Sequence, residues 1–114
     1  MGVVVSTDRF DAMRDFYLHT LGLTPRADRF EHVDFEWGPM RLLIVTHSGV
    51  SGPARDPLRV MLNLDVDDIE AVYERLKARG VEFTRPPERE PWGGWLATFT
   101  DPDGNTLQLL QRPR

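Results

Sequence analysis

The chain has 114 residues, of which 40% are hydrophobic and 28% are charged, and its formal net charge is −4. These values fit one compact domain or two very small repeats that share a core, and they exclude global disorder. The absence of cysteine excludes disulfides, thiol catalysis and zinc–thiolate sites. No sustained basic stripe favours nucleic-acid binding, and no apolar run has the length of a membrane span, so the cytoplasm is the default location.

The first half of the sequence predicts a strand, a helix and three further strands. β-branched residues indicate the first strand over residues 2–7, and Asp8 is the expected N-cap of the helix. The apolar stripe of the helix consists of Met13, Phe16, Tyr17 and Leu21. Gly22 is expected to end the helix in a left-handed conformation. The three strands are expected over residues 23–30, 31–37 and 41–46.

The same order follows a linker over residues 48–57, which is rich in Ser, Gly and Pro. A strand is expected over residues 58–64, and Asp67 with Glu70 forms a capping-box-like pair at the start of the second helix. Gly80 is expected to end this helix. Its three following strands are expected over residues 81–84, 95–100 and 105–111, with the last two joined by the turn Asp101-Pro102-Asp103-Gly104.

This repeated order predicts two tandem βαβββ modules, with module one over residues 1–47 and module two over residues 58–112. A single ferredoxin-like domain with extra strands is the alternative. The alternation within strands predicts a helix-facing set of Val3, Val5, Leu43, Val45, Leu62, Leu64, Leu107 and Leu109. The opposite set consists of Val4, Ser6, Ile44, Thr46, Met61, Asn63, Gln108 and Leu110. Such a mixed surface is typical of a small-molecule cavity, although packing against a partner subunit is the alternative.

Two segments carry a resemblance to a known family. The first is Arg14-Asp15-Phe16-Tyr17 followed by Leu21-Gly22-Leu23, and the second is the hairpin Asp101-Pro102-Asp103-Gly104-Asn105. In this order and spacing the sequence resembles the vicinal oxygen chelate superfamily, which includes glyoxalase I, extradiol dioxygenases, and fosfomycin and bleomycin resistance proteins. The resemblance implies an α+β fold of two tandem βαβββ modules whose curved mixed sheets enclose a cavity, commonly in a homodimer.

Metal-dependent members of this family place His or Glu on the first and last strands of each module. The corresponding positions in this sequence are Gly2 or Val4, Leu43 or Ile44, Met61, and Gln108. None of these is a histidine or a carboxylate, and only Gln108 offers even a weak oxygen ligand. We therefore expect no metal and no cofactor. The three histidines, His19, His32 and His47, are expected at the surface or at strand ends, with His47 pointing to the helix side.

Three tryptophans are candidates for ligand contact, because aromatic side chains near a cavity mouth bind flat or apolar molecules. Trp92 lies in a Pro/Gly-rich loop, and core or dimer-interface packing is the alternative for all three. The acidic residues around Asp67 are explained by helix capping, and Glu88 and Glu90 by a solvated, charge-balanced loop. The complete expected ligand-binding set is Trp37, Met61, Asn63, Trp92, Trp95 and Gln108, with no catalytic or metal-binding residue.

The preferred hypothesis is a dimeric, metal-independent binding protein that sequesters a small organic ligand such as an antibiotic or a metabolite. The first alternative is a lyase, isomerase or dioxygenase-like enzyme with an unconventional or absent metal centre. Only His32 and Asp65 offer that alternative a titratable group near the expected cavity. The second alternative is an interaction module without a ligand.

Overall fold

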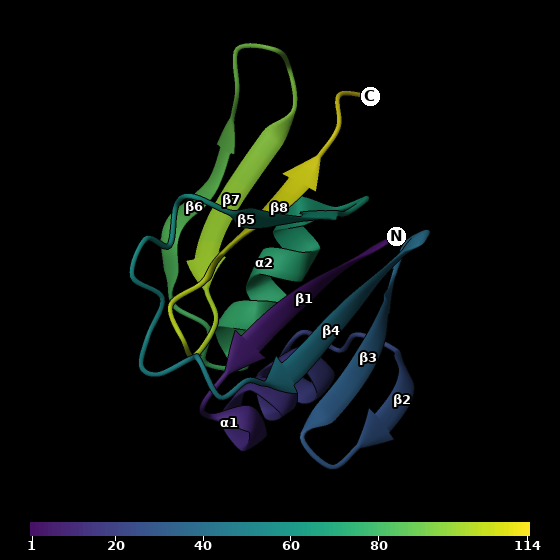
Figure 1. Cartoon of the computed structure of the whole chain (residues 1–114). Coiled ribbons are helices and arrows are strands. Elements are labelled where there is room, and N and C mark those ends of the chain that lie inside the picture. The colour runs from purple at the N-terminus through teal and green to yellow at the C-terminus, as the bar shows by residue number, and fades with distance from the viewer. The chain divides into compact units, whose positions relative to one another are not determined.

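The chain contains two four-stranded sheets, one in each half of the sequence (Figure 1). The computed structural model describes residues 1–114, and the chain divides into two compact units, Met1–Pro53 and Ala54–Arg114. No helix in the chain combines the length and the apolar character that crossing a membrane requires.

The first unit contains four strands and one helical segment. In chain order these are β1 (Gly2–Thr7), α1 (Phe10–Asp15), the π-helical η1 (Phe16–Thr20), β2 (Pro25–Arg29), β3 (His32–Trp37) and β4 (Met40–Thr46). The strand order is β1-β4-β3-β2, in which β1 runs parallel to β4 and the other neighbours are antiparallel.

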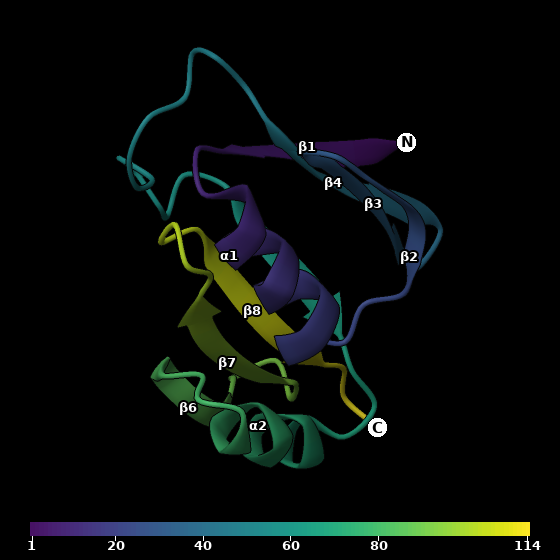
Figure 2. The same cartoon turned by 90° about the horizontal axis from the view of Figure 1, so that it is seen from below.

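The second unit repeats this plan. Its elements are β5 (Met61–Asp65), α2 (Ile69–Ala78), β6 (Phe83–Arg89), β7 (Trp95–Thr100) and β8 (Thr106–Gln111). The strand order is β5-β8-β7-β6, and only β5 and β8 are parallel. Helix α2 covers one face of β6, β7 and β8 (Figure 2). The shared order confirms the predicted pair of tandem βαβββ modules, and each sheet is open rather than closed.

Each helix buries its apolar stripe, which is the main favourable term for so small a unit. The predicted stripe of the first helix is buried, and the Tyr17 ring lies 6.3 Å from the Phe35 ring on β3. In the second unit the Phe83 ring lies 4.7 Å from Tyr73 on α2 and 5.1 Å from Phe99 on β7. Burying one such aromatic or aliphatic side chain contributes about 1.5–3 kcal/mol.

The helix starts differ from the predicted ones. The Asp8 carboxylate accepts a hydrogen bond from the Gly52 backbone N–H at 2.9 Å, so it does not cap α1. Asp68, not Asp67, is the N-cap of α2, where its Oδ1 accepts from the Ala71 N–H at 3.1 Å. The prediction for α1 was wrong because its N-cap position is Arg9, which makes no side-chain cap. The prediction for α2 was wrong by one residue, because Asp65, Asp67 and Asp68 all precede that helix and only the backbone path selects among them.

The helix end and the second-unit turn agree with prediction. Gly22 has a φ of 74°, which is the expected left-handed conformation, after a π-helical turn in which the Leu21 N–H donates to the Phe16 carbonyl at 2.8 Å. In the β7–β8 turn, the Asp101 Oδ1 accepts from the N–H groups of Asp103 and Asn105. Gly104 has a φ of 85°, as its position in a tight turn requires.

The prediction of which β4 side chains face the helix was wrong by one residue. The register pairs Leu42 with Phe35 and Ile44 with Val33, and all four are buried on the face covered by the first helix. Leu43 and Val45 therefore lie on the opposite, open face. The cause is the continuous apolar run from residue 42 to residue 45, in which alternation alone selects no face.

Two outer strands also differ from prediction. β5 begins at Met61 rather than at residue 58, and β6 continues to Arg89 through Pro86 and Pro87 instead of ending at residue 84. The β6–β7 register shifts twice, between Phe83 and Glu88, and the β2–β3 register shifts next to Pro25. Prolines are tolerated here because β2 and β6 are the edge strands of their sheets.

Candidate functional site

The open face of the second sheet is the face of β5–β8–β7–β6 that is turned away from α2. Leu107 and Leu109 on β8 are buried together with Ala97 and Phe99 on β7, so this set faces α2. The alternation of a strand then places Gln108 on the open face, where it is half-buried. The predicted division of β5 and β8 into two faces agrees with this register.

A row of polar side chains crosses the open face from one edge of the sheet to the other. Asn63 on β5 pairs with Gln108 on β8, Gln108 pairs with Thr98 on β7, and Thr98 pairs with Arg85 on β6. Neighbouring strands lie about 4.8 Å apart, so the row spans about 14 Å. Its amides and hydroxyl offer both donors and acceptors at regular intervals.

Apolar side chains flank this row along the strands. Leu110 and Leu96 pair across β8 and β7, one alternation step beyond Gln108 and Thr98. Met61 lies on the other side of Asn63 along β5, and 41% of its surface is exposed. The open face therefore combines a polar line with apolar contact area on either side, which is the composition typical of a small-molecule site.

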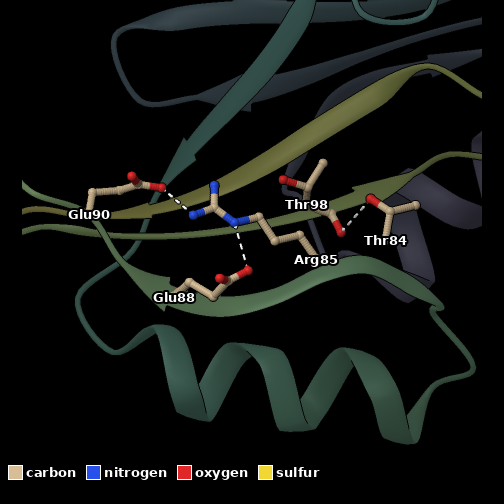
Figure 3. A network of polar contacts seen from close by, with 5 residues as sticks. All are labelled: Thr84, Arg85, Glu88, Glu90 and Thr98. Atoms are coloured by element: carbon tan, nitrogen blue, oxygen red, sulfur yellow. Dashed lines mark hydrogen bonds and ion pairs between the residues drawn. The ribbon is translucent and has the colours of Figure 1, made fainter.

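Two carboxylates hold Arg85 in place at the end of the row. Its Nε donates to Glu88 Oε1 at 2.9 Å, and its Nη2 donates to Glu90 Oε1. Figure 3 shows the guanidinium between these two carboxylates, with α2 on the far side of β6 from the labelled side chains. The hydrogen bonds that Arg85 donates to Glu90 and Glu88 raise the pKa of Arg85, so its charge is fixed. Its Nη1 has no partner within this network.

The irregular pairing of β6 explains why Arg85 reaches this position. Pro86 and Pro87 have no N–H to donate to the ladder, and the register with β7 shifts on both sides of Arg85. The Thr84 hydroxyl instead donates to the Thr98 carbonyl at 3.2 Å (Figure 3). This side-chain bond fastens the shifted strand beside the polar row.

The Trp92 ring lies directly against Gly94, which is buried. A Cβ built on Gly94 would lie 1.9 Å from Trp92 Cζ3 and 2.8 Å from the Gln111 carbonyl oxygen. Gly94 is one residue before Trp95, so alternation places this missing Cβ on the open face, on the side of Leu96. Trp92 is 53% exposed, so much of its ring remains available at this end of the face.

The structure divides the predicted ligand-binding residues into separate sets. Met61, Asn63, Gln108 and Trp92 lie on or beside the open face of the second sheet. Trp95 pairs with Gln111 on the α2 side, where both residues line a pocket of about 530 Å³ beside the start of the helix. Trp37 ends β3 in the first unit, on the face of Phe35.

Sequence reasoning missed the polar contribution of β6 and β7, namely Arg85, Glu88, Glu90 and Thr98. The acidic pair is not merely a solvated surface feature, because it holds the arginine from two sides. The available signal was the pattern of charged residues around Pro86-Pro87. Because two consecutive prolines are typical of a loop, this segment was predicted to be a loop rather than a strand. An edge strand with two register shifts has no simple sequence signature.

Two tandem βαβββ modules, each with a helix on one face of its sheet, define a two-module α+β protein of the glyoxalase-like class. Residues 2–109 match the Glyoxalase/Bleomycin resistance protein/Dioxygenase superfamily, and the chain belongs to this family. The resemblance drawn from the sequence is thereby confirmed. The family includes both enzymes and non-enzymatic binding proteins.

Individual relatives share different amounts of the chain. A bleomycin resistance protein from Klebsiella pneumoniae is 35% identical over 68 residues, which cover 52% of this chain and 54% of that protein. The match thus spans about half the length of this relative. The crystal structure of TnmS3, an antibiotic binding protein from Streptomyces sp. CB03234, is 29% identical with a TM-score of 0.79, covering 99% of this chain and 93% of that one.

A lactoylglutathione lyase from Agrobacterium tumefaciens has the same fold, with a TM-score of 0.78 at 21% identity, covering 97% of this chain and 91% of that one. The metal ligands that the family implies do not fit this chain. At the expected ligand positions, Val4 and its register partner Leu43 in the first sheet have hydrocarbon side chains, and Met61 in the second sheet has a thioether. Of these positions, only Gln108 has a side-chain oxygen to offer. No group of three or more His, Asp or Glu side chains in residues 1–114 is arranged to hold a metal ion. Apolar side chains, a thioether and one amide are poor ligands for a hard divalent cation.

Proposed function

We propose that this protein binds a small organic molecule on the open face of its second sheet without using a metal ion. The observation that carries the proposal is the polar row Asn63–Gln108–Thr98–Arg85, set between apolar side chains. Amides and a fixed arginine favour carbonyl, amide or hydroxyl groups of a ligand, and the leucines and Met61 favour a flat apolar body. An antibiotic or a metabolite with these groups is the proposed ligand class.

The names of two relatives support this proposal. One is a bleomycin resistance protein and the other is an antibiotic binding protein, and the latter resembles this chain over nearly its whole length. The side chains at the expected metal positions are apolar or amide groups, which are poor metal ligands. They therefore favour a binding protein over an enzyme that activates its substrate on a metal ion.

Titration with bleomycin, in the presence and absence of EDTA, tests the proposal by calorimetry and by ¹H–¹⁵N NMR. We expect binding that EDTA leaves unchanged, with shifts concentrated in β5, β7 and β8. A set of fused-ring aromatic carboxamides provides a second, unrelated probe for the same face. If neither probe perturbs these strands, or if binding requires added metal, the proposal is wrong.

Two variants connect the binding to the polar row. Q108L keeps the approximate shape of the side chain and removes its hydrogen bonds, so we expect about tenfold weaker binding, equivalent to about 1.4 kcal/mol. R85Q removes the fixed charge, and R75Q on the exposed part of α2 is its matched control. Unchanged affinity in both Q108L and R85Q would remove this site assignment.

We also propose that the protein acts as a homodimer. Leu58 and Val60, which precede the edge strand β5, are 71% and 67% exposed. Exposed apolar side chains beside a free strand edge favour association. Light scattering after size-exclusion chromatography measures the mass directly, and V60D is expected to shift a dimer toward monomer. A parent protein that is monomeric at all concentrations contradicts this part.

A further inference from the structure

The open face of the first sheet, which is turned away from α1, contains a buried carboxylate. Val33 and Phe35 of β3 are fully buried on the helix face, so Asp34 between them points to the opposite face. Its register partners there are Leu43 on β4 and Ala27 on β2, both apolar. Only 2% of Asp34 is exposed. A carboxylate so covered is expected to have hydrogen-bond partners for both of its oxygens.

Asp34 has partners for only one oxygen. The Arg41 Nε donates to Asp34 Oδ2 at 3.0 Å, and the Arg41 Nη2 donates to the same Oδ2. Asp34 Oδ1 is buried and has no hydrogen-bond partner. The ion pair between Arg14 and Asp28 in the same unit is different, because the two nitrogens of Arg14 donate to separate oxygens of Asp28. The unsatisfied oxygen is therefore a property of the Asp34 position.

A second unsatisfied polar atom lies on the same face of the same strand. His32 Nδ1 is buried without a hydrogen-bond partner, and His32 is two residues before Asp34. Residues two apart on a strand lie about 7 Å from each other on one face. Val45 is the register partner of His32 on β4, and Val4 on β1 is 60% exposed beside Leu43. These side chains provide apolar contact area around the two polar atoms.

The charges around Asp34 determine which chemical group of a ligand can bind to its free oxygen. The guanidinium of Arg41 lowers the pKa of Asp34 through its hydrogen bond, so the carboxylate is ionised at neutral pH and Oδ1 only accepts. A ligand must therefore supply an N–H or O–H donor. Arg26 adds a second positive charge near the carboxylate. Two arginines around one carboxylate oppose a cationic ligand and favour an uncharged donor.

We propose that Asp34 and His32 form a hydrogen-bonding subsite on the open face of the first sheet. The subsite takes an uncharged O–H or N–H donor of an organic molecule whose apolar body rests on Val4, Leu43 and Val45. This inference concerns a different sheet from the proposed function and rests on its own observation, the two unsatisfied buried atoms.

Three related probes test the subsite by ¹H–¹⁵N NMR titration of the whole chain. 2-Naphthol has an apolar body and one uncharged donor, 2-methoxynaphthalene lacks the donor, and 2-naphthylmethylamine carries a positive charge. We expect naphthol to shift the amides of β3 and to bind at least tenfold more tightly than either other probe. Equal affinity for naphthol and its methyl ether overturns the proposal, as does tighter binding of the amine. No shift in β3 with any probe also overturns it, because no ligand then reaches these atoms.

Variants with matched controls complete the test. D34N removes the accepting charge, and D28N is its control because Asp28 also pairs with one arginine in the same unit. H32F removes Nδ1 while keeping a ring, and H19F, on the exposed part of the first helix, is its control. We expect D34N and H32F to weaken naphthol binding at least fivefold while the controls leave it unchanged. H32F keeps the test decisive if D34N does not fold, and unchanged binding in H32F contradicts the proposal.

Discussion

Replacing Gly94 by alanine tests the placement of Trp92 against the second sheet. The added Cβ would lie 1.9 Å from Trp92 Cζ3 and 2.3 Å from Cη2, so the ring must move by about 1.5 Å or more to reach van der Waals contact. The same Cβ would lie 2.8 Å from the Gln111 carbonyl oxygen. That oxygen moves less easily than a ring, because Gln111 pairs with Trp95 in the β7–β8 ladder.

Two opposing effects decide the sign of the stability change. Gly94 has no positive φ, so alanine is compatible with its backbone and restricts the unfolded chain, which contributes about 0.4–1 kcal/mol of stability. Overpacking of this degree costs about 1–3 kcal/mol. We therefore expect G94A to lower the free energy of unfolding by about 1–2 kcal/mol and to lower the Tm by several degrees.

Denaturant unfolding and tryptophan emission measure both consequences. In a W37F/W95F background the emission comes from Trp92 alone, and G94A is expected to shift it to longer wavelength as the ring moves into solvent. W92A provides the control, because G94A should cost at least 1 kcal/mol less when the ring is absent. If G94A leaves both stability and Trp92 emission unchanged, the Trp92 ring does not lie against Gly94.

Three further predictions concern stability. D68A removes the N-cap of α2 and should cost about 1 kcal/mol in denaturant unfolding, whereas D67A should cost almost nothing; equal costs would contradict the cap assignment. L109A removes a buried side chain and should cost about 2–5 kcal/mol, and L110A on the open face should cost clearly less. Because Arg41 lowers the pKa of Asp34 in the folded state, the ion pair stabilises the fold at pH values above the ordinary carboxyl pKa of about 4. This stabilisation is lost as the pH falls through the lower pKa that Asp34 has in the folded state. D34N should therefore flatten the dependence of unfolding free energy on pH below about pH 4, and an unchanged slope would show that the pair contributes nothing.

The features predicted correctly depend on local chemistry. Gly22 has the expected positive φ because a helix that ends in a tight turn favours a residue without a Cβ. The Asp101 turn forms because a short carboxylate accepts from nearby backbone N–H groups. The order of the elements followed from such signals, and it is the same in both units.

The features predicted incorrectly depend on partners that are distant in sequence. Leu42 and Ile44 face the helix because β3 pairs with β4 in one register, and the apolar run itself fits either face. The fixed position of Arg85 depends on two acidic residues after a proline pair and on a shifted register with β7. Local sequence contains no record of that register, so this part of the candidate site required the structure.

The two edges of each sheet are not equivalent. β2 and β6, the outer strands, each contain proline and a shifted register, whereas β1 and β5 at the opposite edges have neither. A twisted edge without a full set of N–H donors is a poor template for another chain. Strand addition is therefore disfavoured at the corresponding edge strand of each module, β2 in the first and β6 in the second. Both outer strands are thus poor sites for the edge-to-edge strand pairing on which fibres depend.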